Sequence, residues 1–143
     1  DSSVGSLACG QRIISVANLD EPRGRIHISS SQGPTRDGRS KPDVAAPGTG
    51  VVAARGFSAD PEKRWLAMTG TRMASPFVTG VVRLMLAKER QLTAAQVEGI
   101  IRRTARPLPG ADFRWANDAG FGQIDPEACI REAGLLFARE DRT

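Results

Sequence analysis

The segment 73–88 constrains the fold more than any other part of the chain, because its apolar residues surround nearly the whole circumference of a helix. These residues are Met73, Phe77, Val78, Val81, Val82, Leu84, Met85 and Leu86. A helix that is apolar on every side is buried inside a domain. Small residues at Ala74, Ser75 and Gly80 predict close contact with a neighbouring element. Pro76 is compatible with this helix, because the amide protons of a first turn have no helical partner.

Short runs typical of β-strands precede this helix. The predicted strands are 13–16, 25–29, 44–46, 51–54 and 65–68. The first is a β-branched run of the kind that forms buried parallel sheets, and the second alternates apolar and polar residues, which predicts one wetter face. The segment 31–42 contains glycines and prolines, which predict a surface loop.

Two further helices are predicted after the central one. Thr93 and Gln96 form a capping box, which starts a helix that we expect to run to about Ala105. Its apolar stripe consists of Val97, Ile100, Ile101 and Ala105, while Glu98, Arg102 and Arg103 are expected to face water. Asp125 as the N-cap and Pro126 at the first helical position open a last helix, which we expect Gly134 to end.

Length and composition indicate one globular unit. A chain of 143 residues with 40% hydrophobic residues can bury a substantial core. No apolar run approaches the roughly 18 residues that a transmembrane helix needs, so we expect no membrane partner. The segment 1–3 lacks the basic region and apolar block of a secretory signal. The cellular compartment cannot be inferred from these features.

The net charge of +4 comes largely from arginines that are spread along the chain and interleaved with acids. Such a pattern predicts solvated surface charge and no nucleic-acid partner. Arg102, Arg103 and Arg106 form the densest basic cluster. A weaker alternative is nucleic-acid binding through the arginines, which would depend steeply on salt concentration.

Cysteine and histidine offer no metal-binding pattern. Cys9 and Cys129 have no metal-ligand spacing, which favours two buried free thiols; a disulfide requires Cα atoms within about 7 Å. His27 lies in the alternating stretch 25–29, which predicts a histidine at a strand surface or in packing rather than a catalytic one. We therefore expect no metal and no cofactor.

Four ordered motifs resemble the subtilisin-like serine proteases, the subtilases. The run Gly70-Thr71-Arg72-Met73-Ala74-Ser75-Pro76 matches the family signature around the reactive serine at every position except 72. The segments 29–48, 5–20 and 120–125 are similar to the family's "SS.GPT.DGR.KPDV.APG", "GSPA…VITVGA.D" and "GYG.VD" stretches, with Leu7 where proline is usual. The resemblance covers residues 5–130.

This resemblance implies an α/β fold, a partial subtilisin-like three-layer sandwich with a mostly parallel sheet and a buried central helix. Residues 1–137 are expected to be the C-terminal portion of a catalytic domain, and 138–143 a charged tail. The family's catalytic aspartate, catalytic histidine and oxyanion-hole asparagine have no counterpart here. The resemblance therefore implies a partner, the N-terminal part of the same domain on another chain or fragment.

Arg72 stands where the family carries its nucleophile. A guanidinium stays protonated at physiological pH and cannot attack a carbonyl, so this chain is expected to be inactive. By resemblance, Thr69, Gly70 and Thr71 flank the scissile bond, Met68 approaches the leaving-group side, and Thr71 supports the oxyanion hole. The alternative for these four residues is that they only finish a strand and cap a helix.

Two functions follow from the resemblance. The first is the C-terminal segment of a subtilisin-like serine endopeptidase, inactivated at position 72. The second is a pseudoprotease, which keeps a docking surface for a peptide or protein ligand and does no chemistry. Whether Arg72 is natural and what the substrate would be do not follow from the sequence.

Two residues near the helix start carry separate expectations. Arg72 opposes the helix dipole by about 0.3–1 kcal/mol, so we expect an offsetting carboxylate from the missing half or from the C-terminus of a bound peptide. Ser75 lies nearly one turn further on, about 5 Å from the lost hydroxyl, and is expected to pack against a neighbour rather than act as nucleophile.

Overall fold

The computed structural model describes residues 3–57, 59–111 and 114–138. The strands are β1 Val16–Asp20, β2 Arg25–Ile26, β3 Val44–Pro47, β4 Val51–Ala54 and β5 Trp65–Met68. The α-helices are α1 Thr71–Lys88, α2 Ala94–Thr104 and α3 Pro126–Leu135. Short 3-10 helices occur at Ser6–Cys9, Glu21–Arg23 and Pro61–Lys63. The fold is α/β, as predicted; most of the predicted tail, 139–143, lies outside the described residues.

The central sheet has the order β2-β1-β3. β1 and β3 run parallel, with Val16 opposite Val44, whereas β2 joins the end of β1 in the antiparallel direction. The segment around Gln123 extends the sheet beyond β3 through a parallel bridge to Ala45. The parallel pair therefore forms the centre of the sheet.

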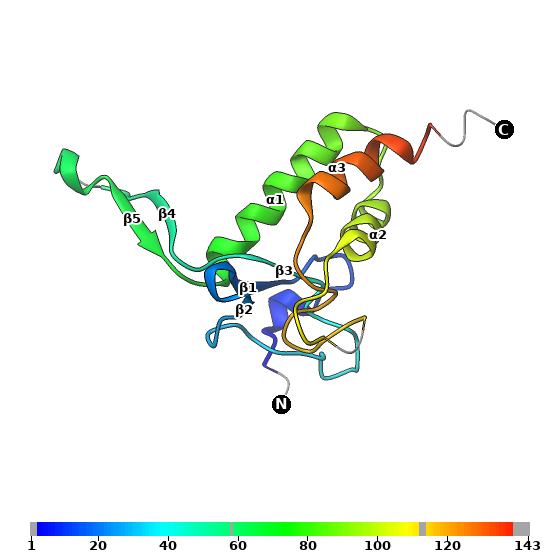
Figure 1. The fold of residues 1–143 in the computed structure, drawn as a ribbon, viewed down its shortest axis with the longest axis horizontal. Coiled ribbons are helices and arrows are strands. Elements are labelled where there is room, and N and C mark those ends of the chain that lie inside the picture. Colours follow the sequence, from blue (N-terminus) through cyan, green and yellow to red (C-terminus); the bar gives the residue numbers. More distant parts are fainter. Residues whose placement is uncertain (1–2, 58, 112–113, 139–143) are drawn as a thin grey trace.

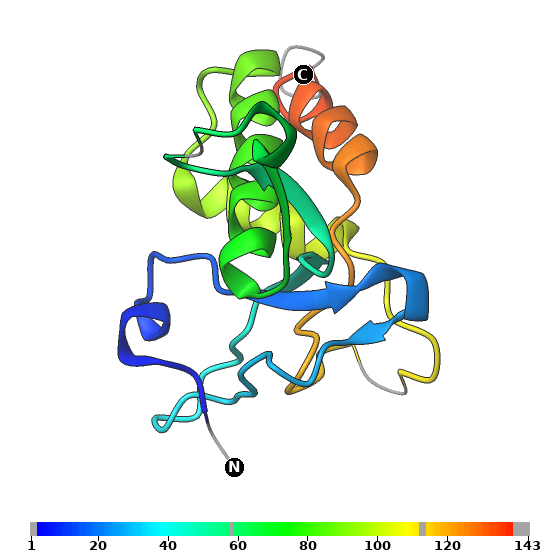
Figure 2. The same cartoon turned by 90° about the vertical axis from the view of Figure 1, so that its left-hand side faces the viewer.

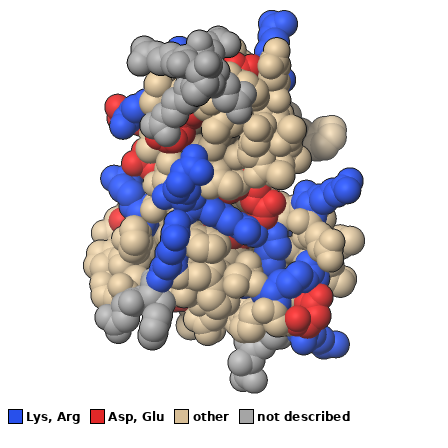
Figure 3. All heavy atoms as spheres, turned by 90° about the vertical axis from the view of Figure 1, so that its right-hand side faces the viewer, with Lys and Arg blue, Asp and Glu red and all other residues tan. Residues whose placement is uncertain are grey.

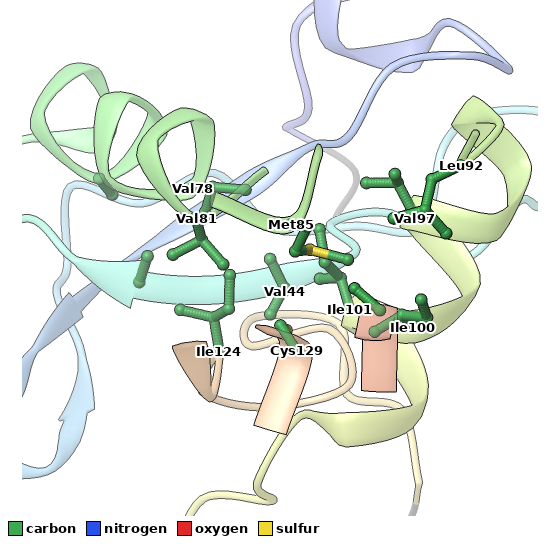
Figure 4. Close-up of a cluster of buried hydrophobic side chains, with 13 residues drawn as sticks. Val44, Val78, Val81, Met85, Leu92, Val97, Ile100, Ile101, Ile124 and Cys129 are labelled. Carbon is green, nitrogen blue, oxygen red and sulfur yellow. The ribbon is translucent and has the colours of Figure 1, made fainter. Parts of the chain in front are cut away.

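Helices α1, α2 and α3 lie on one side of this sheet (Figure 1). Figure 4 shows the core between them, where Val78, Val81 and Met85 from α1 point toward Val44 of β3 and toward α2 and α3. Most of these side chains are almost fully buried. Burial of a side chain of this size stabilises a fold by about 1.5–3 kcal/mol, so this cluster is the main source of stability.

α1 is buried on one face only within this chain. Ala74, Val78, Val81 and Met85 are buried, whereas Phe77 is 41% and Leu84 is 54% exposed. The predicted contacts of Ser75 and Gly80 are absent, since both residues are exposed and the prediction that Ser75 packs against a neighbour is wrong here. The apolar pattern marks every side of the helix, but the described elements supply neighbours for one side.

β4 and β5 form an antiparallel hairpin, with Val51 opposite Met68 and Ala54 opposite Trp65. The hairpin projects from the body of the molecule beside the N-terminal end of α1 (Figures 1 and 2). Val52 is 65%, Trp65 69% and Met68 49% exposed. Because successive side chains of a strand point to opposite faces, the hairpin presents apolar residues on both faces.

The first two strand predictions differ from the structure. β1 begins at Val16, three residues after Ile13, and β2 contains two residues, leaving Ile28 97% exposed. The side chain of Lys41 donates to the Ile13 carbonyl, and Asp43 accepts from the amide of Ser15, so side chains occupy backbone groups that a longer strand would pair. A pattern of β-branched residues does not reveal such competition.

Helix termini agree more closely with prediction. The Thr93 hydroxyl accepts from the Gln96 amide at 3.2 Å and the Gln96 side chain accepts from the Thr93 amide at 2.8 Å, which confirms the capping box. Asp125 caps α3 by accepting from the amide of Ala128. α3 nevertheless continues past Gly134, so the predicted end is wrong by one residue.

Both cysteines are free, and Cys129 is buried as predicted, whereas Cys9 is partly exposed. Within the described residues, no helix is long and apolar enough to cross a membrane. The same part of the chain holds no cluster of three His, Cys, Asp or Glu side chains that could bind a metal ion.

Candidate functional site

The candidate site is the junction between β5 and α1. β5 ends at Met68, and Gly70 caps α1 with φ 155° and ψ 167°, a combination essentially confined to glycine. The Gly70 amide donates to the carbonyl of Gly48 at 2.9 Å, and the Thr69 hydroxyl accepts from the Gly50 amide at 3.0 Å. The turn between β3 and β4 therefore holds the junction in place.

Arg72 is the second residue of α1 and is exposed. The amides of Met73 and Ala74 donate to the Gly70 carbonyl, at 2.9 and 3.3 Å. Within residues 3–57, 59–111 and 114–138, the amides of Thr71 and Arg72 have no hydrogen-bond acceptor. Two free amides at a helix N-terminus attract negative charge.

No carboxylate offsets the Arg72 guanidinium within the described part of the chain. The expectation of an offsetting carboxylate, from the missing half or from a bound peptide, therefore has no support from these residues. The cation lies beside a helix N-terminus that disfavours it. This unfavourable placement makes the position receptive to an anion.

A hollow of about 580 Å³ opens beside Arg72. It is lined by the N-terminal segment around Leu7, by the stretch 13–16 and by Thr71, Arg72, Ser75 and Pro76 of α1. Figure 2 shows this N-terminal segment below and to one side of the start of α1. The hollow falls within the size range of ligand sites, about 300–1,000 Å³.

The other four predicted site residues, 68–71, directly precede Arg72 in the sequence, but not all of them line the hollow. Thr71 lines it and is partly buried, whereas Met68 and Thr69 are exposed and do not line it. Gly70 lies between them as the helix cap. Their roles in substrate binding stay predictions. His27 does not line the hollow, and its Nδ1 lies 2.8 Å from the hydroxyl of Ser29.

A buried network of ion pairs around Asp43 was not predicted from the sequence. Oδ2 of the fully buried Asp43 lies 2.6 Å from the ammonium of Lys41, and Oδ1 accepts from Nε of Arg102 at 2.9 Å and from its Nη2. Arg102 also pairs with Glu98 at 2.6 Å. The expectation that Glu98 and Arg102 simply face water is wrong. The sequence signal was the pair Lys41 and Asp43 directly before the apolar strand β3.

Other arginines pair with acids on the surface. Figure 3 shows Lys and Arg side chains in a band across the right-hand side of the molecule, with Asp and Glu side chains beside them. Arg103 lies 3.4 Å from Glu132, and Arg106 lies 3.5 Å from Asp125. The densest basic cluster of the sequence is thus partly neutralised by acids from other elements.

Two groups away from the junction have shifted pKa values. Hydrogen bonds from the Thr35 hydroxyl and from Arg39 lower the pKa of Asp37. Burial raises the pKa of the Cys129 thiol; the hydrogen bond with Thr104 opposes this shift, and the charge of Asp125 adds to it. Neither group lies at the junction, so neither shift bears on chemistry at Arg72.

Comparison with known proteins matches the sequence motifs. The model of the Subtilase family matches residues 1–122. The chain is 32% identical to subtilisin DY of Bacillus licheniformis over 91% of its length, and 27% identical to the serine protease AprX of Bacillus subtilis over 90%. It spans 41% of the former and 32% of the latter, less than half of each relative.

Solved structures give the same result. Fervidolysin from Fervidobacterium pennivorans, a keratinolytic enzyme related to subtilisin, superimposes with a TM-score of 0.72 at 28% identity. That match covers 88% of this chain and 20% of fervidolysin. The CspB protease of Clostridium perfringens superimposes with a TM-score of 0.77 at 21% identity, which supports the fold alone.

Proposed function

The chain belongs to the subtilase family, and we propose that its residues 1–137 form the C-terminal portion of a subtilisin-like serine endopeptidase domain that is inactive because Arg72 replaces the nucleophile. The observation that carries this proposal is the position of Arg72, second in α1 and directly after the turn at Gly70. In the family motif that the chain resembles, this position carries the serine.

The chemistry at this position explains the predicted inactivity. A nucleophile at a strand-to-helix junction is assisted by free backbone amides, which stabilise the negative oxygen of a tetrahedral intermediate. Thr71 and Arg72 retain such amides within the described residues. The Arg72 side chain donates hydrogen bonds only and has no lone pair to offer a carbonyl carbon. The electrostatic setting is present and the attacking group is replaced.

A second part of the proposal concerns the partner. Apolar side chains are exposed on one face of α1, at Phe77 and Leu84, and on both faces of the β4–β5 hairpin. Contiguous exposed apolar surface marks an interaction site, so we expect a partner to bury these residues. The relatives have more than half of their length outside the region that this chain matches. We propose that the N-terminal part of the same domain, on another chain or fragment, packs against the open face of α1 and the hairpin.

Restoring the nucleophile tests the proposal. Arg72→Ser, combined with the N-terminal part of the domain, is expected to react covalently with a fluorophosphonate probe, and peptide mapping should place the adduct at position 72. Arg83→Ser is the matched control, because Arg83 lies on the same helix and is also exposed. A folded complex in which Arg72→Ser takes up no probe would contradict the proposal.

A pseudoprotease that binds a peptide or protein ligand is the second candidate, and the hollow beside Arg72 favours it. Binding without chemistry needs the pocket and the cation but not the serine. The unchanged chain is then expected to bind peptides measurably in isothermal titration calorimetry, and Arg72→Ala to weaken that binding. Absence of peptide binding by the unchanged chain would exclude the pseudoprotease function and leave the inactive protease segment as the remaining candidate.

A further inference from the structure

Asn18 is a polar residue in the interior of the sheet. It lies in the middle of β1 and is 0% exposed. Its neighbours Ala17 and Leu19 belong to a small separate cluster, whereas Val16 packs against the main core around α1. Because successive side chains of a strand point to opposite faces, the Asn18 side chain points toward α1, whose start lies beside β1 in Figure 2. Burial of an amide in such a place costs free energy unless the amide is hydrogen-bonded.

The side-chain amide of Asn18 makes one hydrogen bond to another described residue. Its Oδ1 accepts from the hydroxyl of Thr49 at 3.2 Å, whereas its Nδ2 is buried and has no acceptor in the described part of the chain. An asparagine side chain can donate two hydrogen bonds and accept two, so most of this capacity is unused. The bond to Thr49 is therefore the contact that the amide provides and that an apolar side chain would not.

Thr49 is the middle residue of the turn between β3 and β4, and both of its neighbours bind the β5–α1 junction. The carbonyl of Gly48 accepts from the Gly70 amide at 2.9 Å, and the amide of Gly50 donates to the Thr69 hydroxyl at 3.0 Å. A hydrogen bond from the core of the sheet thus holds the middle of a turn whose two sides hold the residues directly before α1.

The amide, the turn and the helix start also meet in space. A Cβ added at Gly48 would lie 2.6 Å from Oδ1 of Asn18, 2.8 Å from the Gly70 carbonyl oxygen and 2.9 Å from Cβ of Ala74. Asn18 and the first turn of α1 therefore lie against the same buried residue. A movement of the turn away from Asn18 would move Gly70 with it, because Gly48 is bonded to both sides.

We propose that Asn18 is a positioning residue for the junction: by holding Thr49 from the core side, it fixes the turn 48–50 and, through that turn, the start of α1 and position 72. The inference rests on the proposed function, because the exact place of position 72 matters only where a nucleophile is to attack. Misplacement of a reacting group by about 1 Å costs about 100-fold in rate. The buried amide thus serves the geometry of the junction rather than the stability of the core.

Labelling kinetics test this inference on Arg72→Ser combined with the N-terminal part of the domain. Asn18→Ala and Thr49→Val each remove the hydrogen bond, so we expect either change to lower kinact for the fluorophosphonate probe by about tenfold or more, with the probe's KI little changed. Thr49→Ser keeps the hydroxyl and should keep kinact. Because both substitutions remove the same bond, the double variant should react no more slowly than the slower single variant.

Ser30→Ala is the matched structural control. The Ser30 hydroxyl accepts from the backbone amide of Asn18 at 3.0 Å, so this variant loosens the same residue of β1 without removing its side-chain bond to Thr49. It should lower Tm and leave kinact of the folded complex unchanged. An equal fall of kinact in Ser30→Ala and Asn18→Ala, or an unchanged kinact in Asn18→Ala and Thr49→Val, would overturn the inference.

Amide hydrogen exchange of the 143-residue chain, followed by NMR, measures the same link without any chemistry. In Asn18→Ala we expect the Gly70 amide to exchange about tenfold faster relative to the amides of β3, because its acceptor on Gly48 is held less firmly. An equal acceleration of both, or of neither, would overturn the inference. The two proposals fail separately, since absence of labelling of Arg72→Ser contradicts the inactive protease, and the exchange at Gly70 still decides the role of Asn18.

Discussion

The ammonium of Lys41 lies 2.6 Å from Oδ2 of Asp43, and the two side chains are 4% and 0% exposed. The same carboxylate accepts a hydrogen bond from the Ser15 amide at 2.6 Å and another from Nε of Arg102, a residue of α2, at 2.9 Å. Asp43 thereby ties the loop before β3, the start of β1 and helix α2 together. A buried charge of this kind is stabilised by its partners, and its removal leaves the two cations Lys41 and Arg102 to share Glu98.

We predict that Asp43→Asn lowers the free energy of unfolding by about 3–5 kcal/mol, because Lys41 stays buried after losing the carboxylate 2.6 Å away and keeps only the more distant Glu98, at 3.9 Å. Urea denaturation followed by circular dichroism measures the change. Asp37→Asn is the matched control, since Asp37 pairs with Arg39 at 2.9 Å on the surface; exposed pairs contribute about 0–1 kcal/mol. Similar small effects for both variants would show that the buried network does not stabilise the chain.

Gly48, in the turn between β3 and β4, is predicted to tolerate no side chain without displacing the β5–α1 junction that packs against it. A Cβ at this position would lie 2.8 Å from the Gly70 carbonyl oxygen and 2.9 Å from Cβ of Ala74, closer than such atoms approach in folded proteins. Gly48→Ala should therefore displace the start of α1, with a cost of about 1–3 kcal/mol, and should weaken peptide binding at Arg72.

Gly99→Ala is the control for this variant, because Gly99 lies in α2 and nothing lies within 4 Å of an added Cβ. Alanine is favoured over glycine in a helix by about 0.5–1 kcal/mol, so this variant should be more stable. Thermal denaturation of the two variants gives opposite shifts if the contacts at Gly48 are as described. A rise in Tm for Gly48→Ala would refute them.

The open face of α1 is predicted to serve association rather than stability of this chain. Phe77→Gln and Leu84→Gln should change the free energy of unfolding of the isolated chain by no more than about 1 kcal/mol, because surface substitutions have small effects. The same variants should weaken association with the N-terminal part of the domain, measured by calorimetry. Arg83→Gln, outside the apolar stripe, should leave association unchanged. Normal association by Phe77→Gln and Leu84→Gln together would place the partner elsewhere.

Cys129 is predicted to make the fold sensitive to alkali. Burial raises the pKa of its thiol above the ordinary value of 9.0, so the folded state retains a proton that the unfolded state loses. The stabilising contribution is complete below pH 9.0 and is lost as the pH rises through the folded-state pKa. Urea denaturation at increasing pH should show stability falling above this value, and Cys129→Ala should fall less.

Thiol reactivity offers an independent measurement. Cys9 is partly exposed and should react with Ellman's reagent in the folded chain, whereas Cys129, with its Sγ 3.3 Å from the Thr104 hydroxyl, should react only on unfolding. Two thiols that react equally fast in the folded chain would contradict the burial of Cys129.

Short-range features of the structure were predictable from the sequence. The capping box of Thr93 and Gln96, the N-cap at Asp125 and the strand that leads into α1 each depend on hydrogen bonds or apolar spacing within a few residues. The motif around Arg72 was also recognisable, since a run of seven residues carries it. The subtilase fold followed from four such runs in the right order.

Long-range features were decided by the tertiary structure. Asp43 and Arg102 are 59 residues apart, and neither reveals its partner locally, so Arg102 could not be distinguished from a solvated arginine. The hollow beside Arg72 likewise arises where the segment around Leu7 meets the first turn of α1.

The sequence by itself determined which segments form helices, where they start, and that position 72 holds a cation in a nucleophile's place, because these properties depend on neighbours along the chain. Burial depends instead on which distant segments are present to cover a surface. The sequence marked all sides of α1 as apolar, and only the packed structure decided that Val78 and Met85 are covered while Phe77 and Leu84 remain open.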